Sequence, residues 1–164
     1  MVNHPFLARM LTGRVVVACV GNTWRADDGV GPLIGSLLKA TGRVKVIDCG
    51  ETPENYLGVI ARMKPEKVVV IDAADFGGRP GEVRIVARAD IACGGLATRA
   101  ARLTTFTDYI EAQTGAKTFF LAIQPESLEF GKPLSEVVAG AGRDLAEAIN
   151  SAIKESPWEA AAGW

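Results

Sequence analysis

Runs of apolar residues recur along the chain and predict its strands. Residues 14–20 read Arg-Val-Val-Val-Ala-Cys-Val and residues 67–72 read Lys-Val-Val-Val-Ile-Asp. Both runs are nearly continuous rather than alternating, which is typical of central parallel strands that are covered on both faces. Shorter runs at 44–48 and 118–123 predict two further strands of the same sheet.

The segments between these runs have helical spacing. Apolar residues recur three or four positions apart after Pro32, after Pro53, from Leu103 and after Ser135, and each segment is expected to form a helix. Proline is well suited to the first turn of a helix, and Thr52 and Ser135 are expected to act as N-caps.

One strand breaks the pattern. Residues 82–87 alternate polar and apolar side chains after a glycine- and proline-rich loop at 73–81. A loop this short cannot make a parallel crossover, which needs about a dozen residues, so this strand is predicted to be antiparallel and at an edge. The pattern predicts an α/β fold, a three-layer α/β/α sandwich whose five-stranded sheet is mostly parallel. One domain spanning residues 1–164 is expected, with residues 1–12 and 156–164 peripheral or flexible.

Composition excludes several classes of partner. The chain has 18 basic and 19 acidic side chains and a net charge of −1, which predicts neither nucleic-acid binding nor a polybasic membrane patch. No apolar run approaches the ~20 residues of a membrane span. The three cysteines have no C-x-x-C spacing, which favours a reducing compartment. We expect a cytoplasmic protein that is a monomer.

Acidic residues follow the predicted strands. Sites in parallel α/β folds lie beyond the carboxyl ends of the strands, and that edge would gather Asp28, Asp48, Asp72 and Asp75. Clustered carboxylates repel one another unless they share a proton or a cation, so a divalent metal is predicted. Helix capping by Asp28 and turn formation by Asp48 and Asp75 are the structural alternatives.

Glycines flank the first of these aspartates. Gly29 follows Asp28 directly and Gly31 stands two residues further on, and both would leave room for another group to approach closely.

Other catalytic machinery is missing from the sequence. There is no G-x-S-x-G elbow, Walker sequence or G-x-G-x-x-G loop, which argues against an ordinary serine hydrolase and against dinucleotide binding. His4 is the only histidine and stands in the N-terminal segment, outside the predicted site. Cys19 is expected to be a buried structural thiol, whereas Cys49 and Cys93 could reach the site.

Five groups of residues occur in a fixed order along the chain. They are Val20-Gly21-Asn22 with 27–32, Ile47-Asp48-Cys49-Gly50 with Pro53-Glu54-Asn55, Val70-Ile71-Asp72-Ala73 with Asp75, Pro80-Gly81-Glu82-Val83-Arg84, and Leu121-Ala122-Ile123-Gln124-Pro125. Together they resemble the hydrogenase maturation endopeptidases, and most closely the branch that acts on hydrogenase three of the formate-hydrogen-lyase type. The resemblance runs from about residue 15 to residue 153.

The resemblance implies an aspartyl-type endopeptidase that removes a C-terminal extension from the large-subunit precursor of a [NiFe] hydrogenase after nickel insertion. It implies that Asp28 and Asp72 are the catalytic residues and contact the nickel, which the substrate carries; zinc or cadmium could replace it in a crystal. The expected substrate-binding residues are Asn22, Asp48, Gly50, Asp75 and Arg99.

The chain departs from the family at one ligand. The family carries a Ser/Thr-Thr-His segment, and its histidine falls here on Arg99, or on Ala100 if no gap is allowed. An arginine is always protonated and cannot ligate a metal. One interpretation is an active endopeptidase whose third ligand comes from Asp75, Glu51, a cysteine, water or the substrate. Another is a non-cleaving relative that binds a hydrogenase-like large subunit as an assembly checkpoint, with Arg99 neutralising the aspartates. The third is a different hydrolase or binding module on the same scaffold.

Two mechanisms of cleavage remain open from the sequence. The metal could activate a bound water for attack on the peptide carbonyl, or it could position the substrate while a carboxylate acts as the base. Both mechanisms require the acidic side chains that follow the first and third strands to lie close enough together to contact one ion.

Overall fold

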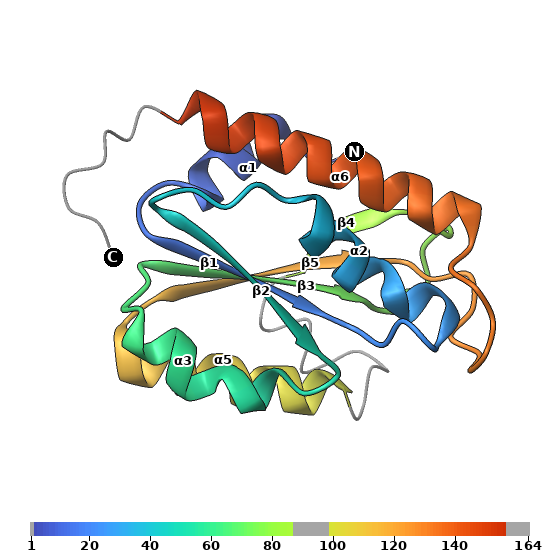
Figure 1. Ribbon diagram of the computed structural model, residues 1–164, viewed down its shortest axis with the longest axis horizontal. Helices are drawn as coiled ribbons and strands as arrows, with labels where there is room; N and C mark the ends of the chain where they lie inside the picture. Colours follow the sequence, from blue (N-terminus) through green and yellow to red (C-terminus); the bar gives the residue numbers. More distant parts are fainter. Residues whose placement is uncertain (1, 87–98, 157–164) are drawn as a thin grey trace.

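The computed structural model describes residues 2–86 and 99–156, with the backbone alone at 99–102, and it is a three-layer α/β/α sandwich (Figure 1). The strands are β1 (Val15–Val20), β2 (Val44–Gly50), β3 (Lys67–Ala73), β4 (Val83–Val86) and β5 (Lys117–Ile123). Their order is β2-β1-β3-β5-β4, in which only the β4–β5 pair is antiparallel. The predicted fold class is confirmed, including the antiparallel edge strand.

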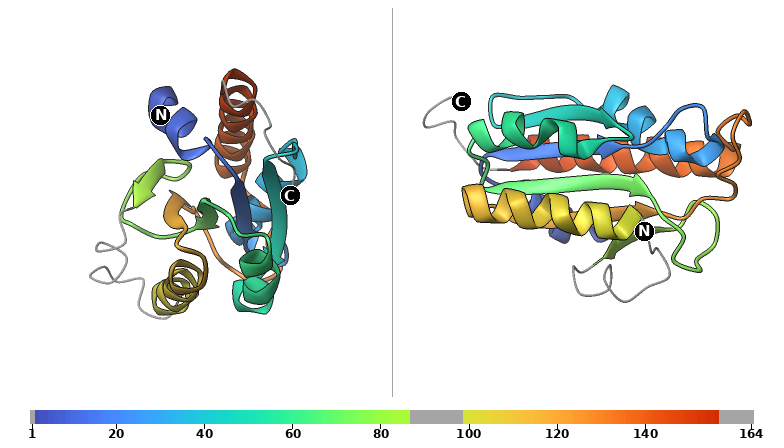
Figure 2. Two further views of the ribbon diagram at one scale, coloured as in Figure 1. Left: turned by 90° about the vertical axis from the view of Figure 1, so that its left-hand side faces the viewer. Right: turned by 90° about the horizontal axis from the view of Figure 1, so that it is seen from below.

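Helices cover both faces of the sheet (Figures 1 and 2). The helices are α1 (His4–Met10), α2 (Val30–Leu37) and α6 (Glu136–Glu155) on one face, and α3 (Leu57–Arg62) and α5 (Arg99–Thr114) on the other. Two short 3₁₀ helices, η1 (Ala26–Gly29) and η2 (Pro53–Tyr56), precede α2 and α3. Within the described ranges, none of the helices is both long and apolar enough to cross a membrane.

Two apolar layers hold the sandwich together. Every residue of β1 is buried, as its continuous apolar run predicts. Alternate side chains of a strand point to opposite faces. Val15, Val17 and Cys19 therefore pack under α2 and α6, whereas Val16 and Ala18 pack under α3 and α5.

The N-terminal segment corrects one expectation. Residues 1–12 were expected to be peripheral or flexible, but α1 buries Leu7 and Met10, and Leu11 follows them into the core. Two buried apolar side chains in a seven-residue helix give too weak a periodicity to predict it from the sequence. Of the C-terminal segment 156–164, all but residue 156 lies outside the described residues.

The expected N-caps need a second correction. Thr52 and Ser135 occupy the N-cap positions of η2 and α6, but neither hydroxyl makes a capping hydrogen bond. The backbone amide of Ser135 instead donates a hydrogen bond to the side chain of Asp27.

Two glycines allow the loop after β1 to close onto the strand. A Cβ atom at Gly31 would lie 2.0 Å from the carbonyl oxygen of Val20, and one at Gly21 would lie 1.9 Å from the carbonyl oxygen of Asp28. Both contacts are to backbone, which cannot move aside as a flexible side chain can. The space that the sequence predicts at Gly31 is thus occupied by the backbone of β1. This close approach lets α2 begin directly against the end of the strand.

We predict that Gly31→Ala destabilises the protein by roughly 1–3 kcal/mol, because the added methyl group overpacks the contact with Val20. Gly140→Ala is the matched control: it lies in α6 with nothing within 4 Å of an added Cβ, and it should stabilise the helix by up to about 1 kcal/mol. Urea denaturation of both variants measures the difference. Equal stability of the two variants would contradict the close contact.

Candidate functional site

The candidate site lies where the parallel strands end. β1, β2, β3 and β5 point the same way, so the loops that follow them meet at one edge of the sheet, at the right-hand end of Figure 1. β1 pairs with β3 directly, and η1, which follows β1, contacts β3. The loop after β1 and the end of β3, which carry Asp28 and Asp72, thus lie at the same edge of the sheet on adjacent strands.

Asp28 is buried in η1, with 2% of its surface exposed. Its Oδ2 atom accepts a hydrogen bond of 2.9 Å from the backbone N–H of Asn22. The N-cap of α2 is Gly29 and has no side-chain capping bond. Asp28 therefore does not cap this helix, and its carboxylate instead bonds to the backbone at the start of the loop after β1.

Asp72 is the penultimate residue of β3, with 3% of its surface exposed. Ile71 and Ala73 pack in the layer under α2 and α6, so the alternation of the strand directs Asp72 to the face that α3 and α5 cover. Cys19 pairs with Ile71, which sets Asp72 beside the last residue of β1.

Asp27 has a role that the sequence analysis missed. Its side chain is fully buried and accepts three backbone hydrogen bonds, from Glu126 (2.7 Å), Ser127 (3.1 Å) and Ser135 (2.7 Å). Burial acts to raise the pKa of Asp27, but the N–H donors of Ser135, Ser127 and Glu126 outweigh it and hold the pKa below its ordinary value. Of the two adjacent aspartates, Asp27 is therefore the one that joins the loop before α2 to the loop before α6.

Further backbone hydrogen bonds join the same two loops. The amide of Ala26 donates to Lys132, that of Asp27 donates to Ser127, and that of Gly131 donates to Trp24, over 2.8–3.1 Å. Ala26 has a φ of +46°, which is unfavourable for a residue with a Cβ. The bonds on either side of it hold this strained conformation next to the aspartate pair.

Asp48, Gly50 and Asn22 build the neighbouring turns. Asp48 is exposed, and its Oδ1 accepts the amide of Gly50 at 3.0 Å, which is the turn role considered for it. The carbonyl of Gly50 accepts the amide of Gly21 at 2.8 Å, and the side chain of Asn22 accepts the amide of Trp24 at 2.8 Å. These residues lie at the predicted edge, where they tie β2 to the loop after β1.

Asp75 belongs to a loop that Gln124 organises. The Oε1 atom of Gln124 accepts the amides of Phe76 (2.9 Å) and Gly78 (3.1 Å), and its Nε2 donates to Asp75 Oδ1 at 3.0 Å. The bonds from Gln124 and from the Gly77 amide hold the pKa of the exposed Asp75 below its ordinary value. Asp75 thus stands at the edge of the site in a turn, as the structural alternative describes.

Arg99 is the first residue of α5, and only its backbone is described. α5 ends at Thr114, shortly before β5 begins at Lys117, so its N-terminus lies toward the carboxyl edge of the sheet. It lies on the face to which β3 directs Asp72. Cys93 lies outside the described residues.

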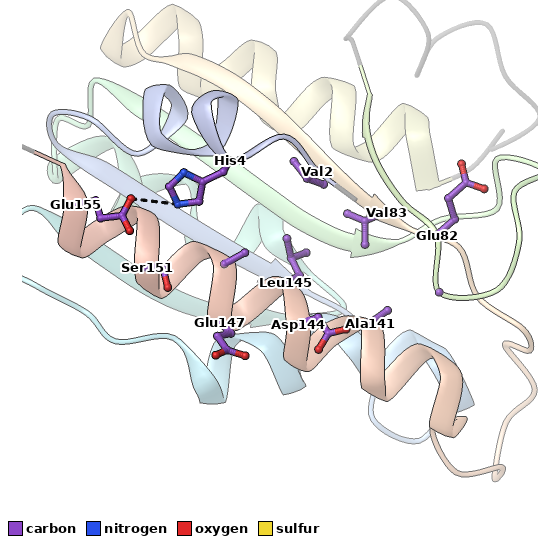
Figure 3. A pocket seen from close by; sticks show the side chains of 12 residues that line it. Val2, His4, Glu82, Val83, Ala141, Asp144, Leu145, Glu147, Ser151 and Glu155 are labelled. Atoms are coloured by element: carbon purple, nitrogen blue, oxygen red, sulfur yellow. Dashed lines mark ion pairs between the residues drawn. The ribbon is translucent and has the colours of Figure 1, made fainter.

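His4 lies at the far end of the molecule. Its Nε2 atom is 3.3 Å from a carboxylate oxygen of Glu155, and the pair lies at one end of a groove of about 660 Å³ between α6 and β4 (Figure 3). Glu155 ends α6, whereas Ser135 at the start of α6 binds Asp27. A helix of 20 residues is about 30 Å long, so His4 cannot bring its imidazole to the candidate site.

The cysteines in the described part of the chain are not ready ligands. Cys19 and Cys49 are buried, and burial, together with the charge of Asp48, raises the pKa of each thiol to about 12. The interpretation of Cys19 as a buried structural thiol agrees with this. Among the residues that the structure describes, no three side chains of His, Cys, Asp or Glu are grouped as a metal site of their own.

The fold and these side chains define a three-layer α/β protein with buried carboxylates at the carboxyl edge of its sheet. A family model described as HycI, hydrogenase maturation protease, matches residues 33–152. The chain belongs to this family, as its resemblance predicts.

Individual relatives agree with this assignment. The hydrogenase 3 maturation protease of Escherichia coli K12 is 33% identical over 152 residues, which cover 91% of this chain and 93% of that protein. The crystal structure of the [NiFe] hydrogenase maturation protease HycI from Thermococcus kodakarensis has a TM-score of 0.85 and 34% identity, covering 92% of this chain and 99% of that one. The solution structure of the endopeptidase HycI from Escherichia coli has a TM-score of 0.75 and 31% identity, covering 84% and 89%.

We predict that Asp27→Asn lowers the free energy of unfolding by about 2–4 kcal/mol at neutral pH, because one or two buried amides lose their acceptor. The pKa of Asp27 is lowered in the folded protein, so its stabilising contribution is present above the ordinary value of 3.8 and is lost as the pH falls through the folded value. Denaturant unfolding at several pH values should show the gap between wild type and variant closing in acid. The exposed Asp144→Asn is the control, and a gap independent of pH would contradict the role of the charge.

Proposed function

We propose that this chain is an endopeptidase that removes the C-terminal extension of a [NiFe] hydrogenase large-subunit precursor once nickel has been inserted. Asp28 and Asp72 contact the nickel that the precursor carries. The observation that carries the proposal is the burial of these two carboxylates, Asp28 in the loop after β1 and Asp72 near the end of the adjacent parallel strand β3, in a chain of the hydrogenase maturation protease family.

The chemistry of the donor set supports a metal that arrives with the substrate. Nickel favours nitrogen or sulfur ligands beside oxygen, and the described part of the chain contributes no imidazole or ready thiolate to this edge. The precursor would supply the remaining ligands. In that arrangement the protease recognises a loaded precursor and ignores an empty one, because the two carboxylates alone bind nickel only weakly.

Cleavage is a hydrolysis. The oxygen of a water molecule bonds to the carbonyl carbon of the scissile peptide, the C–N bond breaks, and a proton passes to the leaving amine. Asp28 and Asp72 would hold the nickel-bearing segment so that this carbonyl faces the water, and the nickel carried by the substrate would supply positive charge beside the reacting groups. The hydrogen bond from Asn22 keeps Asp28 oriented before the substrate arrives.

We predict that Asp28→Asn and Asp72→Asn each reduce kcat/KM by roughly 100-fold or more, the usual contribution of a positioned acid–base or metal-contacting group. The measurement is the mass of a nickel-loaded large-subunit precursor after incubation with each variant. Asp144→Asn, on the exposed face of α6, is the matched control. Full cleavage by either site variant, or cleavage of a nickel-free precursor at the same rate, would overturn the proposal.

A second candidate function is a checkpoint that binds a hydrogenase-like large subunit without cleaving it. It is favoured by the arginine at the start of α5, on the sheet face to which Asp72 points, where the family carries its histidine. A guanidinium there would pair with the carboxylates and take the place of the metal. Retained binding of the loaded precursor with an unchanged mass would select this function over the first.

We predict that Arg99→His raises the affinity for the nickel-loaded precursor and increases the cleavage rate, because an imidazole replaces a cation that cannot ligate a metal. Arg99→Gln is the control, since it removes the charge without adding a ligand. Binding and product mass are measured in parallel. An equal gain from both variants would show that charge removal, rather than ligation, is responsible.

A further inference from the structure

We infer that Trp24 and Phe130 form the surface on which the folded body of the large-subunit precursor docks. This inference rests on the proposed function and deepens it, because it separates the residues that hold the precursor from those that contact its nickel. Trp24 and Phe130 are named the aromatic rim below.

Both members of the aromatic rim are unusually exposed. Trp24 has 71% of its surface accessible and Phe130 has 72%, whereas the other exposed large apolar side chains in the described part of the chain range from 36% to 49%. A single exposed apolar side chain needs no explanation. Trp24 and Phe130 are both large aromatic side chains, and they stand on two loops that are hydrogen-bonded to each other, so their joint exposure needs an explanation.

The aromatic rim is continuous with the candidate site. Asn22 donates its backbone N–H to Asp28 Oδ2, and its side chain accepts the amide of Trp24. The carbonyl of Trp24 accepts the amide of Gly131, next to Phe130. Three hydrogen bonds therefore lead from the carboxylate that would meet the nickel to both aromatic residues.

The loops that carry the aromatic rim are ordered before binding. Phe130 stands in a turn in which Lys132 donates its amide to the carbonyl of Glu129 and pairs with its carboxylate at 2.6 Å. Ser127 accepts the amide of Glu129, and Asp27 fixes the amides of Glu126 and Ser127. Binding through a backbone that is already fixed loses little loop entropy, so exposed aromatic side chains on it are effective anchors.

The position of the rim identifies the occupant. A precursor whose nickel reaches Asp28 has to cover the loop of residues 22–28, and Trp24 stands on that loop. Charges around the rim have mixed sign, from Arg25, Glu126, Glu129 and Lys132, so they neither require nor repel a strongly charged partner. The occupant that fits is a folded protein with an apolar patch beside its metal-bearing C-terminal segment.

The test compares binding with turnover. Trp24→Ala and Phe130→Ala should each raise the Kd of the nickel-loaded large-subunit precursor about 10-fold, as truncation of an interface anchor does, and should raise KM while kcat at saturating precursor stays within about twofold. The matched control is Tyr109→Ala, an aromatic residue of α5 that is 42% exposed. Thermal unfolding of all three variants checks that they fold. Wild-type affinity in both rim variants would overturn the inference and leave the proposed function intact.

Fluorescence of Trp24 gives an independent readout. In a variant with Trp158→Phe and Trp164→Phe, Trp24 is the only tryptophan, and its emission should shift to the blue when the precursor covers it. The absence of a shift while the precursor is bound and cleaved would overturn the inference alone. A blue shift that depends on protein concentration without precursor would assign the rim to a second copy of the chain and also overturn it. Failure of the wild-type chain to bind the precursor at all would overturn the proposed function first.

Discussion

The buried carboxylate of Asp27 is the interaction on which the candidate site depends. It accepts three backbone N–H groups from the segment between β5 and α6, while its own backbone belongs to the loop after β1. A buried charge is costly unless it is fully hydrogen-bonded, and here the hydrogen bonds come from a loop about a hundred residues away in sequence. The same carboxylate that fixes the two loops also fixes the backbone from which Asp28 and Trp24 project, so stability and site geometry are linked through one residue.

Close backbone packing complements this hydrogen bonding. Gly21 and Gly31 let the carbonyls of Asp28 and Val20 approach where a side chain would otherwise stand. The loop after β1 is therefore held at its ends by steric fit and in its middle by Asp27. A site with little freedom of its own would suit the proposed substrate, which carries its own metal, because preorganised carboxylates need no reorganisation when that metal arrives.

Much of the fold could be predicted because its signals are local. The apolar runs before Val20 and Asp72 predicted central strands, and the short loop before β4 predicted its antiparallel pairing, since no crossover fits in so few residues. The site was harder. Asp27 and Asp28 are adjacent and chemically identical, so only long-range contacts distinguish the one that binds the loop at 126–135 from the one that faces Asn22. The role of Gln124 in ordering the loop at 76–78 and the burial of Leu7 and Met10 likewise depend on partners far along the chain.

The positions of the elements bear on which residues could replace the family's histidine, which this chain lacks. His4 is paired with Glu155 about one length of α6 away from Asp27, and the thiols of Cys19 and Cys49 have pKa values near 12. His4 and these two cysteines therefore do not supply the ligand that the family's histidine provides and that an arginine cannot. The two buried carboxylates are hard oxygen donors. By themselves they would bind only weakly a metal such as nickel, which favours nitrogen or sulfur ligands beside oxygen. In the proposed function, weak intrinsic affinity would favour discrimination, because a nickel ion already fixed in a precursor would need fewer further ligands than a free ion. Affinity for the precursor must then come from protein contacts outside the metal site, and the ordered loops that carry Trp24 and Phe130 are suited to provide them.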